Sequence, residues 1–274
     1  MSVRQRVGGW RAARLPARAA RRHRARFFEV ERYCFFVGFP RSGTTLVGQL
    51  LNAHRHALIA YELNAFAFIQ QHPDRDQLFG MLIEKDTQFV DQGRVGAGDY
   101  EFAVPGQWQG KTERLRVIGD KKAGESTDRL RSHPELLEQV RRIVGVPIRV
   151  LCVTRNPFDT VATLARRHEE SIEWAAERYA GWAEPLARIR SALEPDELLD
   201  VRHEDLVADP ARELDRLCTF LDIDAPDEYL AACASIVFPS ARRPRDGRDW
   251  PDPVTHQIED LIGAHPFLAN YTLT

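Results

Sequence analysis

The sequence of 274 residues has few cysteines, no metal-binding motif and no long apolar run. Neither C-x-x-C nor H-E-x-x-H occurs, so we expect no metal site. No apolar run approaches the ~20 residues that a membrane-spanning helix requires, so we expect no membrane span. The net charge of −2 gives no reason to expect a nucleic acid as a partner. The four cysteines are far apart in apolar stretches, which favours buried free thiols in a reducing, cytoplasmic compartment.

The N-terminal segment 1–32 differs in composition from the rest, because it holds ten arginines and only two glutamates. This composition predicts a solvated, partly disordered basic arm (1–32) that precedes a single folded domain (33–274). The alternative is a basic helix that contacts an acidic partner, a membrane surface or the substrate. The arm contains no apolar core segment, so we expect no secretory signal peptide.

Three segments combine a buried strand with a following helix. YCFFVGF (33–39) is almost wholly apolar, as in a buried parallel strand, and TTLVGQLLNAH (44–54) has apolar residues at helical spacing. The same pattern recurs in 148–167, where Asn156-Pro157 marks the turn into the helix. A third stretch, 198–206, leads into a helix that Asp209-Pro210 caps. Strands that alternate with helices predict an α/β fold with a parallel sheet flanked by helices.

Two regions lack this pattern. Residues 64–115 mix aromatic residues, glycines and charges without a clear period, and we expect helices and loops that cover a site. The tail 240–274 opens with an arginine-rich loop, ARRPRDGRDW, and ends with a helix-like stretch, VTHQIEDLIGA.

The segment GFPRSGTT (38–45) lies between the first predicted strand and its helix and resembles a phosphate-binding loop. Gly38 and Gly43 have the spacing of G-x-x-x-x-G-K-[ST] and Thr45 is in place, but Thr44 replaces the lysine. Backbone N–H groups of such a loop bind an anion without any side chain, whereas a polyphosphate needs the lysine and Mg²⁺. A ligand with a single phosphate-like group at its 5′ end would not need them, and Arg41 supplies a cation within the loop.

The segment FPRSGTTLV resembles the 5′-phosphosulfate loop of sulfotransferases that use 3′-phosphoadenosine 5′-phosphosulfate (PAPS). The family's second signature is an arginine at a strand end and a hydroxyl residue eight positions later, both on the 3′-phosphate. Arg155 and Thr163 have this spacing, although the family usually has serine at the second position. The resemblance covers roughly residues 33–274. It implies a cofactor loop made of Pro40, Arg41, Ser42, Gly43, Thr44 and Thr45.

The similarity extends to the tyrosylprotein and bacterial branch of that family, which carries its catalytic base at a fixed spacing after the loop arginine, just past the first helix. Glu62 stands at that spacing after Arg41. The branch also has a lysine in a G-D-K segment that steadies the sulfate and the leaving group, which implies this role for Lys121 in IGDKKAG, with Lys122 as the alternative. His54 and His56 are alternative bases, because another branch uses histidine.

Three further features have weaker signals. Arg242, Arg243 and Arg245 lie in a loop similar to the basic C-terminal loop that holds the 3′-phosphate in many sulfotransferases; the alternative is a solvated arginine cluster. The segment HEDLVADP resembles the family's Y-E-D-L segment and indicates a strand end and a helix cap. Asp120 could stand for a Walker-B aspartate.

These features predict a metal-independent sulfotransferase with a P-loop-type parallel sheet. It would move the sulfuryl group of PAPS to a hydroxyl, less readily an amine, of a small-molecule, glycan or peptide acceptor and release 3′-phosphoadenosine 5′-phosphate (PAP). Glu62, Lys121 and Arg41 would be the catalytic residues. A kinase with a degenerate loop and a non-catalytic nucleotide-binding module are the alternatives.

Overall fold

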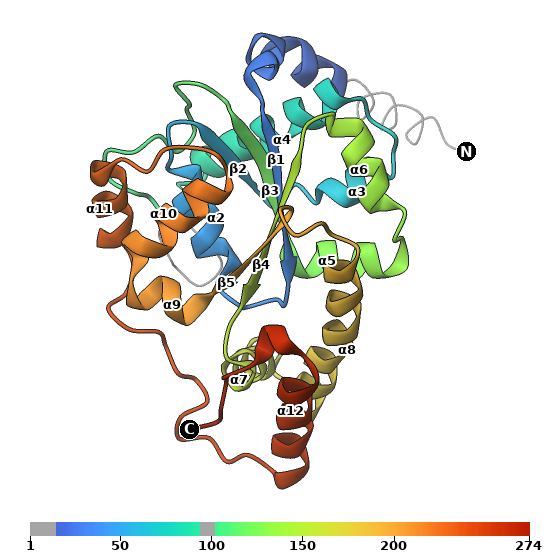
Figure 1. Cartoon of the computed structure of the whole chain (residues 1–274), viewed down its shortest axis with the longest axis vertical. Coiled ribbons are helices and arrows are strands. Elements are labelled where there is room, and N and C mark those ends of the chain that lie inside the picture. The colour runs from blue at the N-terminus through green and yellow to red at the C-terminus, as the bar shows by residue number, and fades with distance from the viewer. Residues whose placement is uncertain (1–14, 94–101) are drawn as a thin grey trace.

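The computed structural model describes residues 15–93 and 102–274 (Figure 1). Its five strands form one parallel sheet in the order β2-β3-β1-β4-β5. The strands are β1 (Arg32–Gly38), β2 (Ala57–Tyr61), β3 (Val117–Lys121), β4 (Ile148–Thr154) and β5 (Leu198–Arg202). The helices are η1 (Arg24–Glu29), α2 (Thr44–Asn52), α3 (Ala65–Ile69), α4 (Arg75–Asp91), α5 (Ala123–Ser132), α6 (Leu136–Val144), α7 (Pro157–His168), α8 (Ile172–Ser191), α9 (His203–Ala208), α10 (Pro210–Phe220), α11 (Asp227–Ser235), α12 (Asp252–Ala264) and η2 (Pro266–Leu268).

Helices cover both faces of the sheet, as the apolar run of β1 requires. Tyr33 and Phe35 of this central strand point into one core cluster, which contains residues of α4, α6 and α8. Cys34 and Phe36 point into the other cluster, with residues of α2, α10 and α11. Figure 1 shows α2, α10 and α11 on one side of the sheet and α5, α6 and α8 on the other. The predicted α/β fold with a parallel sheet is confirmed.

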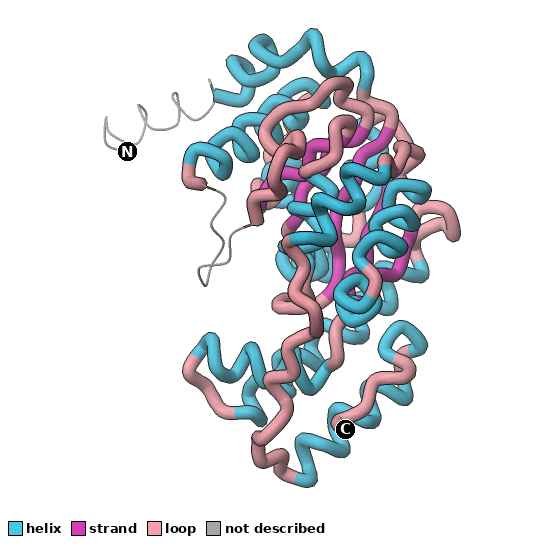
Figure 2. Tube along the Cα trace, turned by 90° about the vertical axis from the view of Figure 1, so that its left-hand side faces the viewer, coloured by secondary structure: helices cyan, strands magenta, loops and turns pink. Residues whose placement is uncertain are grey.

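The C-terminal part of the chain extends beyond one end of the sheet. Figure 2 shows the strands (magenta) in the upper part of the molecule and the C-terminus among helices and loops below them. In Figure 1 these helices are α7, α12 and the lower turns of α8. The end of the sheet from which α7 leaves is therefore bordered by a separate group of helices.

The local signals in the sequence mark the observed element boundaries. The strand predicted over 33–39 is β1, and the helix predicted after the loop is α2. Asn156 caps α7, since its side chain accepts a hydrogen bond from Phe158 N at 3.0 Å, and Pro157 is the first residue of that helix. Asp209 caps α10 in the same way, with Arg212 N as the donor.

Residues 15–32 differ from the solvated arm that their composition predicts. A helix over residues 15–23 packs on α4, where Ala19 is buried and a side chain at Gly80 would lie only 2.6 Å from its backbone. Arg22 pairs with Glu84 of α4 at 2.6 Å. The buried residue Phe27 joins the same core, so apolar contacts and one acidic partner order this segment. The remainder of the predicted arm, 1–14, lies outside the described residues.

The described part of segment 64–115 lies mainly against the sheet. Phe79 and Leu82 of α4 belong to one core cluster, whereas Phe102 and Val104 belong to the other. Residues 94–101 lie outside the described residues. The role of this segment as a cover for the acceptor stays a prediction.

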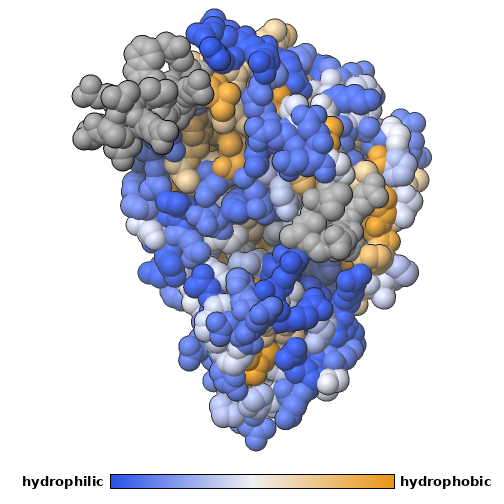
Figure 3. All heavy atoms as spheres, turned by 180° about the vertical axis from the view of Figure 1, so that it is seen from behind, coloured by the Kyte–Doolittle hydropathy of each residue, from blue (hydrophilic) through white to orange (hydrophobic). Residues whose placement is uncertain are grey.

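Two further expectations concern the surface and the thiols. Within residues 15–93 and 102–274, no helix is both long and apolar enough to cross a bilayer. Seen from behind, the surface is mostly hydrophilic with separate apolar patches (Figure 3). All four cysteines are buried free thiols, as their apolar surroundings predict.

Candidate functional site

The loop, Glu62, Lys121 and Arg155 all lie at the carboxyl ends of strands of the sheet. The loop follows β1, Glu62 follows β2, Lys121 ends β3, and Arg155 follows β4. Since β1 lies between β3 and β4, the chain leaves neighbouring strands in opposite directions at this edge. In open parallel sheets, such a switch point is where ligands bind.

The loop after β1 presents the amino end of α2 to this edge. Gly43 precedes the helix with φ of 91°, and a β-carbon there would clash with Nδ1 of His203. Only glycine meets both demands. The first N–H groups of α2 have no carbonyl partner within the helix, so this end of the helix attracts an anion.

The loop side chains divide between structural and exposed positions. Ser42 is fully buried, and its hydroxyl donates to Phe39 O at 2.8 Å, so only its backbone N–H remains for a ligand. Arg41 adopts a left-handed φ of 68° and forms no ion pair with the part of the chain that the structure describes. Burial, followed by the charge of Arg167, lowers the pKa of Arg41. Both effects penalise its charge until an anion binds nearby.

Glu62 is held between two consecutive lysines. Its Oε1 accepts from Nζ of Lys121 at 2.6 Å, and its Oε2 accepts from Nζ of Lys122 at 2.7 Å. Lys121 also donates to Oγ1 of Thr45 at 3.0 Å, so this ammonium group joins Glu62 to the loop helix. Both lysines that the sequence left as alternatives therefore contact the predicted base, but only Lys121 contacts the loop as well.

Lys121 places a cation where the loop sequence has none. Its side chain is 2% exposed and crosses α2 at Gly48, where a β-carbon would lie 2.9 Å from Cγ of Lys121. The ammonium group ends 4.2 Å from the centre of the Tyr61 ring, a cation–π contact. A residue of the neighbouring strand thus brings a positive charge to Thr45, at the start of the loop helix.

The two lysines govern the charge of Glu62. Burial disfavours the ionised carboxylate, but the charges and hydrogen bonds of Lys121 and Lys122 outweigh it and lower its pKa. Glu62 is therefore ionised at neutral pH. A carboxylate offers about four lone pairs, so it can accept a further proton donor beside the two lysines.

Asp120 is an acceptor for the backbone that follows β2. Its Oδ1 accepts from Leu63 N at 2.9 Å and its Oδ2 accepts from Ala65 N at 2.8 Å. Both oxygens are thus occupied by backbone donors in the turn after β2. Burial raises the pKa of Asp120 to about 6, although these donors favour its ionised form.

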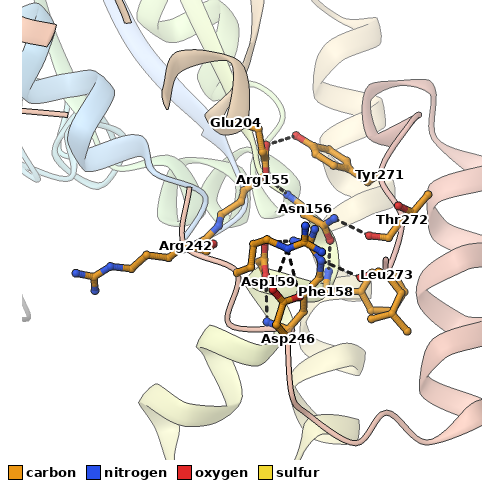
Figure 4. Close-up of polar contacts among 12 residues, drawn as sticks. Arg155, Asn156, Phe158, Asp159, Glu204, Arg242, Asp246, Tyr271, Thr272 and Leu273 are labelled. Carbon is orange, nitrogen blue, oxygen red and sulfur yellow. Dashed lines mark hydrogen bonds and ion pairs between the residues drawn. The ribbon is translucent and has the colours of Figure 1, made fainter. Parts of the chain in front are cut away.

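The turn that carries Arg155 is joined to the C-terminal segment (Figure 4). Asn156 donates its side-chain N–H to Thr272 O at 2.7 Å, and its backbone N–H donates to Glu204 at 2.8 Å. The second carboxylate oxygen of Glu204 accepts from the hydroxyl of Tyr271 at 3.0 Å. Glu204 belongs to the HEDL segment, so its role here is structural, in line with the prediction for that segment.

Arg155 precedes α7, and Thr163 lies within this helix. Nη2 of Arg155 donates to the backbone oxygen of Arg242 at 2.6 Å, whereas its buried Nε has no hydrogen-bond partner within the described residues (Figure 4). The hydroxyl of Thr163 donates to Asp159 O at 2.7 Å. Burial lowers the pKa of Arg155, an unfavourable state for a cation that an anionic ligand would relieve.

The three tail arginines have different surroundings. Arg245 forms an ion pair with the buried Asp159, and its Nε donates to Leu273 O at 2.9 Å, so it anchors the tail to α7. Arg243 pairs with Asp246 at 3.0 Å. Arg242 stacks on Phe238 at 4.9 Å. The structure thus ties Arg245 to the fold, whereas Arg242 contacts Arg155 through its backbone oxygen and points its side chain away from Arg155 (Figure 4).

The two histidines considered as bases lie at the opposite edge of the sheet. His54 and His56 precede β2, whereas Glu62 follows it. His54 is tied by its Nε2 to Asp224 O at 2.8 Å, and its Nδ1 accepts from His56 N at 3.0 Å. A five-residue strand spans about 16 Å, so neither ring shares a site with the loop.

Two site residues had no recognisable signal in the sequence. His203 lies against Gly43, and its buried Nδ1 has no partner within the described residues. Burial and then the charge of Arg155 lower its pKa to about 4, so this ring is neutral. The hydroxyl of Thr127 accepts from Gly38 N at 3.0 Å and fixes the start of the loop. Both contacts join segments that are distant in the sequence.

Comparison with known proteins identifies the family. A sequence profile described as the sulfotransferase family matches residues 34–227, so the chain belongs to the sulfotransferase family. No curated protein sequence matches the chain.

Solved sulfotransferase structures share its fold at low identity. The sulfotransferase domain of the Synechococcus PCC 7002 olefin synthase has 18% identity and a TM-score of 0.55, covering 86% of this chain and 94% of that one. The sulfotransferase domain from the curacin biosynthetic pathway has 18% identity and a TM-score of 0.52, with 86% and 98% covered. The sulfotransferase STF9 of Mycobacterium avium has 11% identity and a TM-score of 0.50, with 91% and 81% covered.

Proposed function

We propose that this sulfotransferase moves the sulfuryl group of PAPS to a hydroxyl, less readily an amine, of a small-molecule, glycan or peptide acceptor, with Glu62 as the base. The observation that carries the proposal is the cluster of Glu62, Lys121, Lys122 and Thr45. It places a carboxylate beside the amino end of the loop helix, with two ammonium groups at 2.6 and 2.7 Å from its oxygens.

The polar groups of the site fit PAPS. The loop 40–45 would hold the 5′-phosphosulfate through its N–H groups, with Arg41 as an added cation. Arg155 and Thr163 would hold the 3′-phosphate, with Arg242 and Arg243 beside them. The buried Nε of Arg155 and Nδ1 of His203 have no hydrogen-bond partner within the described residues, so hydrogen-bonding capacity is left unused beside the proposed nucleotide site.

The chemistry requires little beyond position and charge. PAPS supplies the sulfuryl group when bound, and PAP leaves once the bond from sulfur to the bridging oxygen breaks. Glu62 accepts the proton of the acceptor hydroxyl as that oxygen bonds to sulfur. Lys121 neutralises the negative charge that develops on the leaving oxygen, which it can do from its place beside Thr45.

The loop speaks against the kinase alternative, because Thr44 stands where a P-loop kinase has the lysine that reaches the β- and γ-phosphates. Asp120, considered above as a Walker-B aspartate, accepts two backbone hydrogen bonds in the turn after β2.

Two measurements test the proposal. PAP in the presence of EDTA should raise the melting temperature, and adenosine 5′-phosphate should do so much less, because only PAP engages Arg155 and Thr163. Incubation with ³⁵S-labelled PAPS and a panel of phenols, alcohols, glycans and tyrosyl peptides should label at least one acceptor.

Each alternative predicts a different outcome. Binding of ATP with Mg²⁺ but not of PAP would establish the degenerate kinase. Binding of PAP without transfer to any acceptor would establish a non-catalytic nucleotide-binding module. If transfer is observed, a crystal soaked with PAP would locate the acceptor pocket beside the sulfate position.

A further inference from the structure

The turn that carries Glu62 has an unusual backbone. Glu62 has φ of 61° and Asn64 has φ of 63°, so two residues of three lie in the left-handed region. Residues with a β-carbon avoid this region, glutamate more so than asparagine. Between β2 and α3 the backbone must therefore be held by contacts from elsewhere in the fold.

Asp120 supplies these contacts. It lies opposite Ala60 in the parallel register of β2 and β3, one position before the end of each strand. Its two oxygens accept from the N–H groups of Leu63 and Ala65, at 2.9 and 2.8 Å. The side chain is buried, so water cannot replace it as the acceptor for these two groups.

The three consecutive residues at the end of β3 thus act on one glutamate. Asp120 holds the backbone that follows Glu62, at Leu63 and Ala65. Lys121 and Lys122 hold the two oxygens of the Glu62 carboxylate. The side chain of Glu62 is 33% exposed, so packing alone does not fix its direction. The direction of the Glu62 side chain therefore depends on the backbone conformation of the turn 62–64.

We infer that Asp120 is the positioning residue of the base: its carboxylate holds the left-handed turn 62–64 and thereby aims Glu62 between the two lysines and toward the loop. Asp120 does not touch the reacting atoms. This inference rests on the function proposed above, because it assigns a purpose to the direction of Glu62.

The first test replaces the carboxylate. Asp120→Asn keeps one acceptor oxygen but presents N–H donors to the other backbone N–H, so one of the two bonds is lost. We expect kcat to fall about 10- to 100-fold, which corresponds to one charge-assisted hydrogen bond. The dissociation constant of PAP should stay within about twofold, because its proposed contacts lie on the loop and after β4. Hydrogen exchange at the amides of Leu63 and Ala65 should become faster.

Asp86→Asn is the matched control. Asp86 of α4 is also buried, and it accepts a hydrogen bond from Asn52 of α2 at 2.7 Å, a bond that lies outside the turn 62–64. In this variant kcat should equal that of the wild type, and amide exchange at Leu63 and Ala65 should remain as slow as in the wild type. A fall in kcat here would show a general effect of losing a buried carboxylate.

A second pair of variants tests the turn without altering Asp120. Asn64→Gly and Asn64→Val both remove the hydrogen bond from Asn64 to Glu125, but only glycine retains access to a φ near 63°. We expect near-normal kcat for the glycine variant and a fall of about 10- to 100-fold for the valine variant. This pair decides the question if Asp120→Asn fails to fold.

Three results would overturn the inference: unchanged kcat in Asp120→Asn, unchanged amide exchange at Leu63 and Ala65, or equal kcat in the two Asn64 variants. Failure of the proposed function looks different. The wild type would then transfer no sulfuryl group to any acceptor, while amide exchange in Asp120→Asn would still report whether the carboxylate holds the turn.

Discussion

Replacing Glu62 by glutamine tests the centre of the site, because glutamine keeps the shape of the side chain but cannot accept the proton of the acceptor. General-base catalysis typically contributes ~10²–10⁴-fold, so kcat should fall by about that factor. The affinity for PAP should stay nearly unchanged, since Arg155 and Thr163 lie on another strand and helix. The fall should therefore be confined to the chemical step.

The variant should also lose some stability. Glutamine removes the carboxylate partner of Lys121, which is only 2% exposed, and of Lys122, which is 30% exposed. Hydrogen bonds to charged groups contribute about 1.5–3 kcal/mol, and glutamine retains a neutral one, so we expect a loss of roughly 1–3 kcal/mol in the free energy of unfolding. Glu84→Gln is the matched control, because Glu84 also contacts two side chains through its carboxylate, Arg22 at 2.6 Å and His23 at 3.0 Å.

The pH dependence separates the base from the lysine. The pKa of Glu62 lies below its ordinary value of 4.5. In the wild type, kcat should therefore decrease only below about pH 4.5, where Glu62 becomes protonated. That loss should be absent from Glu62→Gln. In Lys121→Ala it should persist and move to higher pH, because removing a cation raises the pKa of the carboxylate. The pKa of Asp120, about 6, also depends on the charges of Lys121 and Glu62, so only the loss below about pH 4.5 is assigned to Glu62.

Single-turnover measurements of transfer from labelled PAPS, made at saturating PAPS from pH 4 to 8, report the chemical step directly. Lys121→Ala should lower this rate by roughly 10²–10³, as expected for one preorganised cation. A Glu62→Gln enzyme with near-normal single-turnover rates would refute the assignment of the base. The assignment to the sulfotransferase family would stand, because it rests on the match over residues 34–227.

Other positions give independent tests. Arg155→Ala should weaken PAP binding about 10- to 100-fold in calorimetry, and equal binding of PAP and adenosine 5′-phosphate by the wild type would contradict this role. Thr44→Lys should abolish transfer without creating Mg²⁺-dependent ATP hydrolysis, and a gain of that activity in a phosphate-release assay would favour the kinase alternative. Gly48→Ala should lower kcat about tenfold, because the new β-carbon would lie 2.9 Å from Cγ of Lys121. The better helix propensity of alanine limits any fall in melting temperature. An unchanged kcat would show that Lys121 can move without loss of activity.

The sequence alone was sufficient for the features that depend on neighbouring residues. The loop could be predicted because a buried strand, two spaced glycines and a helix follow one another within 33–54. The turn at Asn156-Pro157 is equally local, since the cap and the first helical residue are adjacent. The apolar run of β1 predicted a buried parallel strand, and hence helices on both faces, because every side chain of a central strand must be covered.

Composition was a poorer guide to residues 15–32. The ten arginines of segment 1–32 indicate a solvated arm, but composition cannot show that Ala19 and Phe27 meet apolar residues of α4 or that Glu84 receives Arg22. Such contacts depend on which helix lies beside the segment. Only the folded chain determines that.

The arrangement around Glu62 was decided by the tertiary structure for the same reason. Glu62 and Lys121 are 59 residues apart, and they meet because β2 and β3 are paired in parallel and end at the same edge of the sheet. Because of that pairing, both lysines contact the carboxylate of Glu62. For the same reason Asp120, which the sequence offered as a Walker-B aspartate, accepts hydrogen bonds from the turn after β2. His54 and His56 are close to Glu62 in the sequence, but β2 separates them from the loop by the length of a strand. A β-strand carries the chain about 3.3 Å per residue from one end of the sheet to the other.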